Sequence, residues 1–455
     1  MLLAYLVSFV KETLTDARQT IVNREGIKSL YQVSLYRNTI YLVVYSGVNS
    51  VTGVLFWIAA ARLYDAEAVG LASAVIAAIG FVVLFSSLGL DYGLIRFLPD
   101  AGNKANDIIN SCFTTAGLTA LVLAGIFLAG LGVWSPALLG IRESLAFLAS
   151  FLLLGIVFTL SGFVIQVFIA RRRAGFTLAQ GLIFGLSRFI PLFLLVPIYL
   201  DFGIYVSWGI AVAASTLIAV FWFLPRVLKE YRPRFTIKKT VLAEMLRFSL
   251  ANYVSNIFWA LPLVVLPLMV VNILGAEQNA YFYVGWSVAS IMFIIPVSTS
   301  QSLYAEGSHD QEKLGREVRK SLKISLVLIV PALIIVLVLG DKIMWLFGRA
   351  YTENTTRLIW TIAVSVVPMS INFIYLSIKR VQKKMKSAVV LTAFMCVATL
   401  GLSYFLLPVM GILGAGVAWL AGQTGAALII TYKFFTSRSQ NSKTRNAVPP
   451  EIRWT

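Results

Sequence analysis

The sequence predicts an all-α membrane protein in which twelve transmembrane helices form two six-helix bundles of the same orientation. Hydrophobic residues make up 59% of the 455 residues and the mean hydropathy is +0.84, both higher than in soluble domains. Apolar stretches of about 20 residues, the length that crosses a bilayer, recur along the chain. Lysines and arginines collect in alternate connections between these stretches, as membrane insertion requires.

The N-terminal half consists of a leader and six predicted spans. Residues 1–37 open on an apolar run, LLAYLVSFV, that is too short to span and is followed by a net basic segment. We expect this leader to be cytoplasmic or interfacial. Residues 38–224 are predicted to form the first bundle, with spans at Asn38–Ala61, Ala68–Leu90, Ile108–Val133, Leu145–Ala170, Phe176–Pro197 and Ile204–Leu224.

A basic connection separates this half from the next. Residues 225–247 carry seven basic residues against two acidic ones, so we interpret them as a cytoplasmic linker. Residues 248–432 are predicted to form the second bundle, and residues 433–455 a basic cytoplasmic tail. The spans of the second bundle are predicted at Phe248–Leu274, Ala280–Ser300, Leu322–Gly340, Leu358–Ile378, Ala388–Leu407 and Ile412–Thr431.

The positive charges predict the orientation of the chain. With both termini in the cytoplasm, and with Lys323 at the edge of its span counted as cytoplasmic, 32 of the 38 lysines and arginines are cytoplasmic, five fall in outer connections and one lies deep inside a span. Losing one helix from the count would invert every later connection and destroy this bias. We therefore predict twelve spans and two cytoplasmic termini.

The two halves repeat each other at an offset of about 210 residues. The segment LYDAEAVG at 63–70 aligns with ILGAEQNA at 273–280, and Glu143 aligns with Glu353. Because each repeat has an even number of spans, both copies have the same orientation. We expect a two-fold axis along the membrane normal and a substrate path between the bundles.

Several short motifs point to a family. Arg37-Asn38 begins the first span, Glu67–Gly70 begins the second, and LGLDYGLIRFLP follows at 88–99. ARRR at 170–173 and GILGAGVAW at 411–419 continue the pattern. In this order and spacing the chain resembles the polysaccharide-transport family of the multidrug/oligosaccharidyl-lipid/polysaccharide exporter superfamily. The resemblance implies a flippase that moves a lipid-linked oligosaccharide or polysaccharide precursor from the inner to the outer leaflet by alternating access, for cell-surface glycan assembly.

The composition argues against other classes of function. The two cysteines lie in apolar runs and the chain has a single histidine, so the sequence predicts no metal site, no cofactor and no catalytic residues. The net charge of +18 comes from short clusters beside spans, where contact with anionic lipids explains it better than nucleic acid does. We therefore predict a transporter rather than an enzyme, located in the plasma membrane.

Arg188 is the one basic residue predicted far from either end of a span. A charge near the bilayer centre costs at least about 2.5 kcal/mol on insertion, and no acidic residue is predicted at mid-span to neutralise it. An anion in a central cavity would do so, and a guanidinium suits the diphosphate that links lipid to sugar. The alternative is a structural arginine bonded to carbonyl groups or water.

Polar and aromatic side chains recur at helical spacing in two repeat-related spans and are candidate sugar-binding residues. Interhelical hydrogen bonding within each half is the alternative. The candidates are Ser46, Asn49 and Trp57 in the first span, and Asn252, Asn256 and Trp259 in the seventh.

Four residues are candidates for gating. Pro262 and Pro267 interrupt the seventh span and can act as bends. Asp91 and Arg96 lie at the inner end of the second span, where they either pair with each other or gate the inner mouth.

Gly181 and Gly185 form a small-xxx-small pair on the helix of Arg188, which indicates close helix packing.

Three rival functions stay open. A cation-coupled multidrug exporter of the same superfamily typically uses intramembrane carboxylates, which the spans lack. A membrane polysaccharide polymerase or ligase usually carries its active residues on a long outer loop, and the longest one predicted here, residues 341–357, is short. A lipid scramblase or scaffold is the third. The partners expected for the flippase are a lipid-linked saccharide, anionic membrane lipids and glycan-assembly enzymes.

Overall fold

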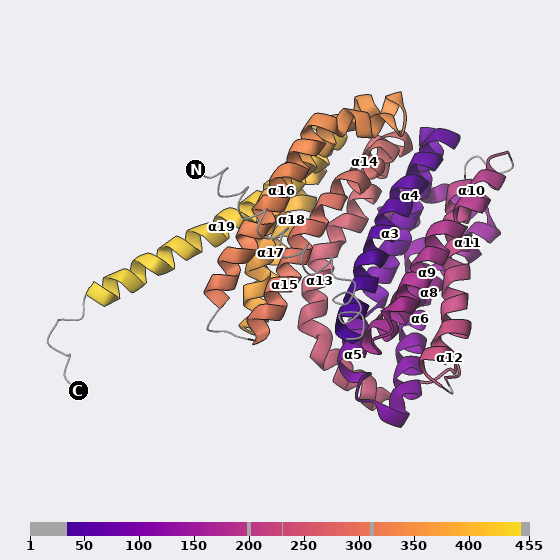
Figure 1. Cartoon of the computed structure of the whole chain (residues 1–455). Helices are drawn as coiled ribbons and strands as arrows, with labels where there is room; N and C mark the ends of the chain where they lie inside the picture. Colours follow the sequence, from indigo (N-terminus) through magenta and orange to yellow (C-terminus); the bar gives the residue numbers. More distant parts are fainter. Residues whose placement is uncertain (1–33, 198–201, 230, 310–313, 447–455) are drawn as a thin grey trace, which may run out of the picture. The chain divides into compact units, whose positions relative to one another are not determined.

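The computed structural model describes residues 34–197, 202–229, 231–309 and 314–446 (Figure 1). Most of the predicted leader and the end of the predicted tail lie outside these residues. The described residues contain no strand, and twelve of their helical segments are long and apolar enough to cross a membrane, which confirms the predicted fold class. The α-helices are α3 Ser34–Leu63, α4 Ala66–Ser86, α5 Leu90–Phe97, α6 Ala105–Ala129, α7 Leu131–Trp134, α8 Leu145–Ala170, α9 Ala174–Ser187, α10 Phe189–Leu195, α11 Gly203–Ile218, α12 Leu224–Val227, α13 Lys239–Leu274, α14 Ala276–Ala289, α15 Ile294–His309, α16 Leu314–Trp345, α17 Arg349–Val381, α18 Met385–Met410 and α19 Ile412–Asn446.

Several helices extend beyond the predicted spans. Helix α13 begins at Lys239, nine residues before the predicted span, and α16 and α17 are longer at both ends. Hydropathy detects only the apolar part of a helix. Residues such as Glu244 and Arg247 are good helix formers, so the helix continues into polar sequence.

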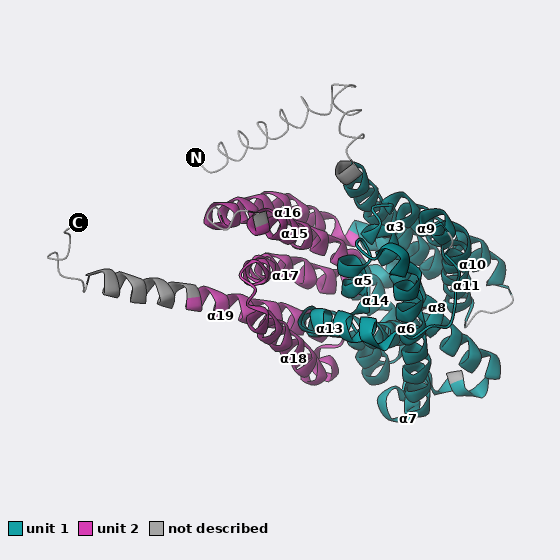
Figure 2. Ribbon diagram, turned by 90° about the horizontal axis from the view of Figure 1, so that it is seen from below, with its two compact units in different colours: residues 1–287, 342–354 teal, residues 288–341, 355–455 magenta. Residues whose placement is uncertain are grey.

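The chain divides into two compact units (Figure 2). The first comprises residues 1–287 and 342–354, and the second comprises residues 288–341 and 355–455. In the first unit, α3 packs on α9, α6 packs on α8, and α13 packs on α4 and α5. In the second, α18 packs on α19.

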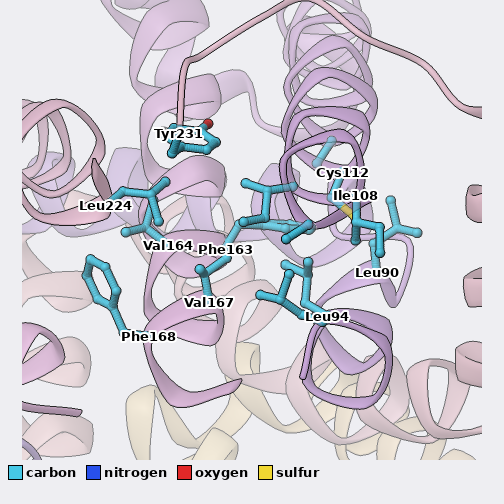
Figure 3. Packing of buried hydrophobic residues seen from close by; sticks show 14 of the residues in the cluster. Leu90, Leu94, Ile108, Cys112, Phe163, Val164, Val167, Phe168, Leu224 and Tyr231 are labelled. Carbon is cyan, nitrogen blue, oxygen red and sulfur yellow. The ribbon is translucent and has the colours of Figure 1, made fainter. Parts of the chain in front are cut away.

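A cluster of buried hydrophobic residues packs together within the first unit (Figure 3). Leu90 and Leu94 of α5 meet Cys112 of α6 and Phe163 of α8, and each of these side chains is buried. Because α5 is short and carries its leucines at helical spacing, one face points into the cluster. The cluster therefore holds the LGLDYGLIRFLP motif against the bundle.

The linker is bonded to α6 along eight residues, 231–238, which we call the strap. Three buried side chains of α6 form hydrogen bonds with backbone groups of the strap, much as a neighbouring strand would. The bonds run from Asn110 Nδ2 to the Arg232 carbonyl (3.0 Å), from the Tyr231 hydroxyl and the Arg234 N–H to Asn110 Oδ1 (3.0 and 3.3 Å), from the Thr236 N–H to Thr114 Oγ1 (3.3 Å) and from the Lys238 N–H to Ser111 Oγ (3.0 Å).

The internal repeat is visible in local backbone geometry. The turn before α9 places Arg172 at φ +55°, and the turn before α18 places Lys383 at φ +57°. Each turn also makes the same three backbone hydrogen bonds at an offset of 211 residues. The equivalent bonds are Arg171 N to Val167 O, Arg172 N to Ile169 O and Arg173 N to Phe168 O in the first turn, and Gln382 N to Ile378 O, Lys383 N to Arg380 O and Lys384 N to Lys379 O in the second.

The second unit is held together partly by buried polar pairs between helices. The hydroxyl groups of Ser300 on α15 and Ser377 on α17 lie 2.6 Å apart. Asn372 of α17 donates to the side chain of Gln423 on α19 at 2.8 Å. Such bonds fix the register of helices whose apolar surfaces are otherwise interchangeable with lipid.

Candidate functional site

Helices α3 and α9 approach closely because two glycines face α3. A Cβ added at Gly181 would lie 2.6 Å from the ring of Tyr45, and one added at Gly185 would lie 2.7 Å from Thr52 Oγ1. Neither distance is compatible with a methyl group without movement of the neighbour. The prediction that this glycine pair marks close packing is confirmed.

Arg188 lies where the helix of the fifth span is interrupted. Helix α9 ends at Ser187 and α10 begins at Phe189. Pro191 has no N–H to bond the Ser187 carbonyl and its ring crowds that group, so the α-helical pattern breaks here. Arg188 lies at this break, and its side chain contacts α3.

The guanidinium of Arg188 is buried against α3. The residue is 4% exposed, and Nη2 donates a hydrogen bond of 3.2 Å to Thr52 Oγ1. The guanidinium carbon lies 4.7 Å from the ring centre of Phe56 and 4.8 Å from that of Phe184. These rings stabilise the cation through their faces but accept no ordinary hydrogen bond.

Part of this guanidinium is unsatisfied. The Nε–H of Arg188 is buried without a hydrogen-bond partner among the described residues, and no acidic side chain there forms an ion pair with it. An unpartnered donor on a buried cation is costly. The guanidinium is therefore suited to bind an anion that accepts a hydrogen bond from Nε–H.

Aromatic rings extend the site along α3. Trp57 is buried, and its ring meets that of Tyr283 on α14 edge to face, with 4.8 Å between centroids. Tyr283 is also close enough to interact electrostatically with Arg188. The guanidinium of Arg188 and the rings of Trp57 and Tyr283, which carry polar atoms at their edges, thus form one site within the first unit.

The structure brings together only some of the predicted substrate-binding residues. Asn49 is half-buried beside Gly181, one turn from Thr52, while Ser46 is exposed. Asn49, Trp57 and Arg188 therefore share the surroundings of the α3–α9 contact. Asn252, Asn256 and Trp259 are half-buried on α13, which packs on α4 and α5.

Four residues of this site escaped sequence reasoning: Thr52, Phe56, Phe184 and Tyr283. Phe184 precedes Arg188 by four residues, so helical spacing could have identified it. Thr52 and Phe56 look like ordinary apolar-face residues in sequence. Tyr283 comes close only through tertiary packing of α14.

The predicted gating residues lie in different settings. One carboxylate oxygen of Asp91 is buried without a hydrogen-bond partner in the described chain, and burial raises the pKa of this carboxyl to about 6. Arg96 does not pair with Asp91 and instead lies 3.9 Å from Asp100, where both side chains are exposed. Pro262 and Pro267 are buried inside α13, which is continuous through both.

Comparison with known proteins gives a family match and a set of structural neighbours. The family described as "Polysaccharide biosynthesis protein" matches residues 35–291, and the MatE family matches residues 250–405. A Shigella flexneri protein provisionally named an O-antigen transporter is 26% identical over 155 residues, which are 33% of this chain. The chain matches only 37% of that relative's length.

Solved structures share the fold. An inward-facing multidrug resistance transporter of the MATE family aligns with a TM-score of 0.68 at 14% identity, over 90% of this chain and 100% of its own. The lipid II flippase MurJ in an inward closed conformation gives 0.69 at 13% identity, with 87% of each chain covered. A MOP superfamily transporter from Pyrococcus furiosus gives 0.61 at 14% identity, over 90% and 95%.

Proposed function

Because the chain belongs to the polysaccharide biosynthesis protein family of the MOP superfamily, we propose that it is a flippase for a lipid-linked oligosaccharide or polysaccharide precursor. It is a multi-pass protein of the plasma membrane with twelve spans. The saccharide would move from the inner to the outer leaflet by alternating access of the bundles at 38–224 and 248–432. The product would supply cell-surface glycan assembly.

The observation that carries this proposal is the buried and partly unsatisfied guanidinium of Arg188. A diphosphate presents several acceptor oxygens in the geometry of the guanidinium fork. Binding would neutralise the charge and satisfy Nε, so the cost of burying the arginine would be offset when substrate is present. The empty state would keep the penalty, which favours reloading.

The rest of the site fits a sugar beside that diphosphate. Indole and phenol rings offer apolar faces to the C–H surface of a sugar and polar atoms to its hydroxyl groups. Trp57 and Tyr283 supply such rings, and Asn49 supplies both a donor and an acceptor. Asn252, Asn256, Trp259 and Ser46 remain proposed contacts for the same substrate.

A cation-coupled multidrug exporter is the second candidate, because the MatE family matches residues 250–405 and a MATE transporter shares the fold. Such exporters typically use intramembrane carboxylates to couple transport to Na⁺ or H⁺. The described site instead presents a cation, which repels cationic drugs and attracts phosphates. We therefore place the flippase first.

Depletion of the protein in its host tests the proposal. We expect lipid-linked saccharide to accumulate on the cytoplasmic side and surface glycan to fall, while assembly of the lipid-linked sugar continues. Unchanged surface glycan together with raised sensitivity to cationic drugs would favour the exporter. Expression of the wild-type chain in the depleted cells is the control.

A further inference from the structure

A basic cavity lies where α9 begins, and Arg188 is not among its lining residues. Its volume is about 410 Å³, and Arg37, Arg172 and Arg173 are among its lining residues. The other lining residues are Asn38, Tyr41, Gly175, Phe176, Ala179 and Phe223. Two motifs 133 residues apart in sequence, Arg37-Asn38 and ARRR, thus contribute to one cavity.

A hydrogen bond between helices fixes this arrangement. Asn38 Oδ1 accepts from the Ala174 N–H at 2.9 Å, so the start of α3 caps the start of α9. The residue at the cap position of α9, Arg173, makes no such bond with its own side chain. The cap keeps Arg37 beside the ARRR turn.

The turn carries an arginine where the backbone favours other residues. Arg172 has φ +55°, a conformation that glycine and asparagine adopt more readily. Arg172 and Arg173 are both exposed, whereas Arg37 is half-buried. The geometry of the turn alone therefore does not account for an arginine at this position.

The chemistry of the cavity has two parts. No acidic side chain lines it, so the three arginines have no counter-charge among the lining residues. Tyr41, Phe176 and Phe223 give it an apolar wall. A phosphate held by the guanidinium groups, with an alkyl chain along the rings, would match both parts.

We propose that this cavity binds the phosphate group of a lipid, at a site additional to Arg188. Two sources share that chemistry: the diphosphate of a lipid-linked precursor and the headgroup of an anionic phospholipid. If the ligand is the precursor, the inference rests on the proposed function, and the cavity is a site where the substrate binds before transport. If the ligand is a phospholipid, the cavity holds a resident membrane lipid.

The repeat supplies a charge-matched control for the test. The double variant Arg172→Asn with Arg173→Gln removes two charges and leaves a residue that tolerates the left-handed backbone. Lys383→Asn with Lys384→Gln makes the same change in a turn of the same geometry that does not line the cavity. Melting curves show whether each variant folds, and Arg37→Gln is the alternative if the turn variant does not.

Affinity for farnesyl diphosphate, inorganic diphosphate and phosphatidylglycerol is measured on full-length protein in detergent, with phosphatidylcholine as the neutral lipid. We expect the double variant at Arg172 and Arg173 to lose about tenfold or more in affinity for a phosphate-bearing lipid. The double variant at Lys383 and Lys384 should lose less than about twofold. Loss confined to farnesyl diphosphate identifies the precursor as the source. Loss confined to phosphatidylglycerol identifies the membrane lipid.

Equal losses in both variants, or no loss in either, would overturn the inference. The same would follow if only inorganic diphosphate binding fell, since the apolar wall would then play no part. Flipping by wild-type protein in liposomes is measured separately. Absence of flipping contradicts the proposed function and leaves a phosphate-binding cavity intact, so the two failures are distinguishable.

Discussion

Nη2 of Arg188 and Oγ1 of Thr52 lie 3.2 Å apart, although the residues are separated by 136 positions. The threonine hydroxyl itself donates to the Val48 carbonyl at 2.8 Å, so its oxygen is oriented toward the arginine. The hydrogen bond orients one side of the guanidinium and leaves Nε without a partner.

Arg188→Ala should lower flipping by about 100-fold or more, because the phosphate loses charge-assisted hydrogen bonds from the fork. Arg188→Lys should recover only part of the activity, since an ammonium keeps the charge but not the planar geometry. Flipping and melting temperature are measured on the same purified proteins. Arg226→Ala, which removes an exposed arginine stacked 4.6 Å from Trp222, is the control. Loss of stability with normal flipping would make Arg188 structural.

Gly185→Ala should destabilise the first unit by about 1–3 kcal/mol, because the new methyl group would be 2.7 Å from Thr52 Oγ1. Gly53→Ala on α3 has open space within 4 Å and should be neutral or stabilising by about 0.5–1 kcal/mol. Thermal unfolding in detergent compares the two. Similar melting temperatures for both variants would show that the helices can separate without cost.

Asn110→Ala should release the strap from α6. The side chain makes three hydrogen bonds to the strap, and their loss should raise the rate of tryptic cleavage after Arg234 by about tenfold or more. Mass spectrometry of timed digests locates the cut. Asn354→Ala, which removes an exposed asparagine bonded only within α17, should digest like wild type. An unchanged pattern for Asn110→Ala would mean that other contacts hold the strap.

Asp91 should make stability depend on pH. Burial raises its folded-state pKa to about 6 from an ordinary 3.8, so the folded protein binds more protons than the unfolded one in this range. The contribution of Asp91 is fully present below about pH 4 and is lost as the pH rises through 6. Cys112 of α6 and Tyr253 of α13 face this carboxyl and carry no positive charge to offset the loss.

Asp91→Asn should therefore stabilise the protein at pH 7.5, on the order of 2 kcal/mol, and gain progressively less toward pH 4. Thermal unfolding at several pH values measures the difference from wild type. Asp107→Asn removes an exposed carboxylate that lies 3.6 Å from Lys238 and should show no such gain. A constant difference across the pH range would indicate that Asp91 does not titrate there.

The predicted orientation is tested by labelling single cysteines in a version that lacks Cys112 and Cys396, both of which are buried. Cysteines at His309 and Lys383 should resist an impermeant thiol reagent in intact cells, and a cysteine at Asn354 should react. Lys383 and Asn354 are both exposed, so access through the membrane decides the result. The reverse pattern would place the termini outside.

Length and hydropathy were sufficient to predict the twelve spans, because crossing a bilayer constrains composition directly. Arg188 was found for the same reason, since a charge stands out within an apolar run. Thr52 and Phe56 were missed because buried polar and aromatic residues are common in such helices. The extension of α13 to Lys239 was missed because a helix outside the membrane needs no apolar composition.

The family resemblance points to the motif ARRR, but not to its proximity to Arg37. That proximity depends on the bond between Asn38 and Ala174, which no local pattern reveals. The strap presents the same difficulty. Asn110 lies in a predicted span, where a polar residue suggests contact between helices, but its partners are two backbone groups and one tyrosine hydroxyl of a connection.

The strap also bears on how the chain assembles. Asn110, Ser111 and Thr114 recognise mainly backbone atoms of residues 231–238, which is how proteins commonly capture extended peptides. A chain divided just ahead of the strap would leave its second fragment with a peptide that docks on the first. The strap would therefore act as a docking peptide. Two co-expressed fragments would associate through its binding to α6, without a covalent link.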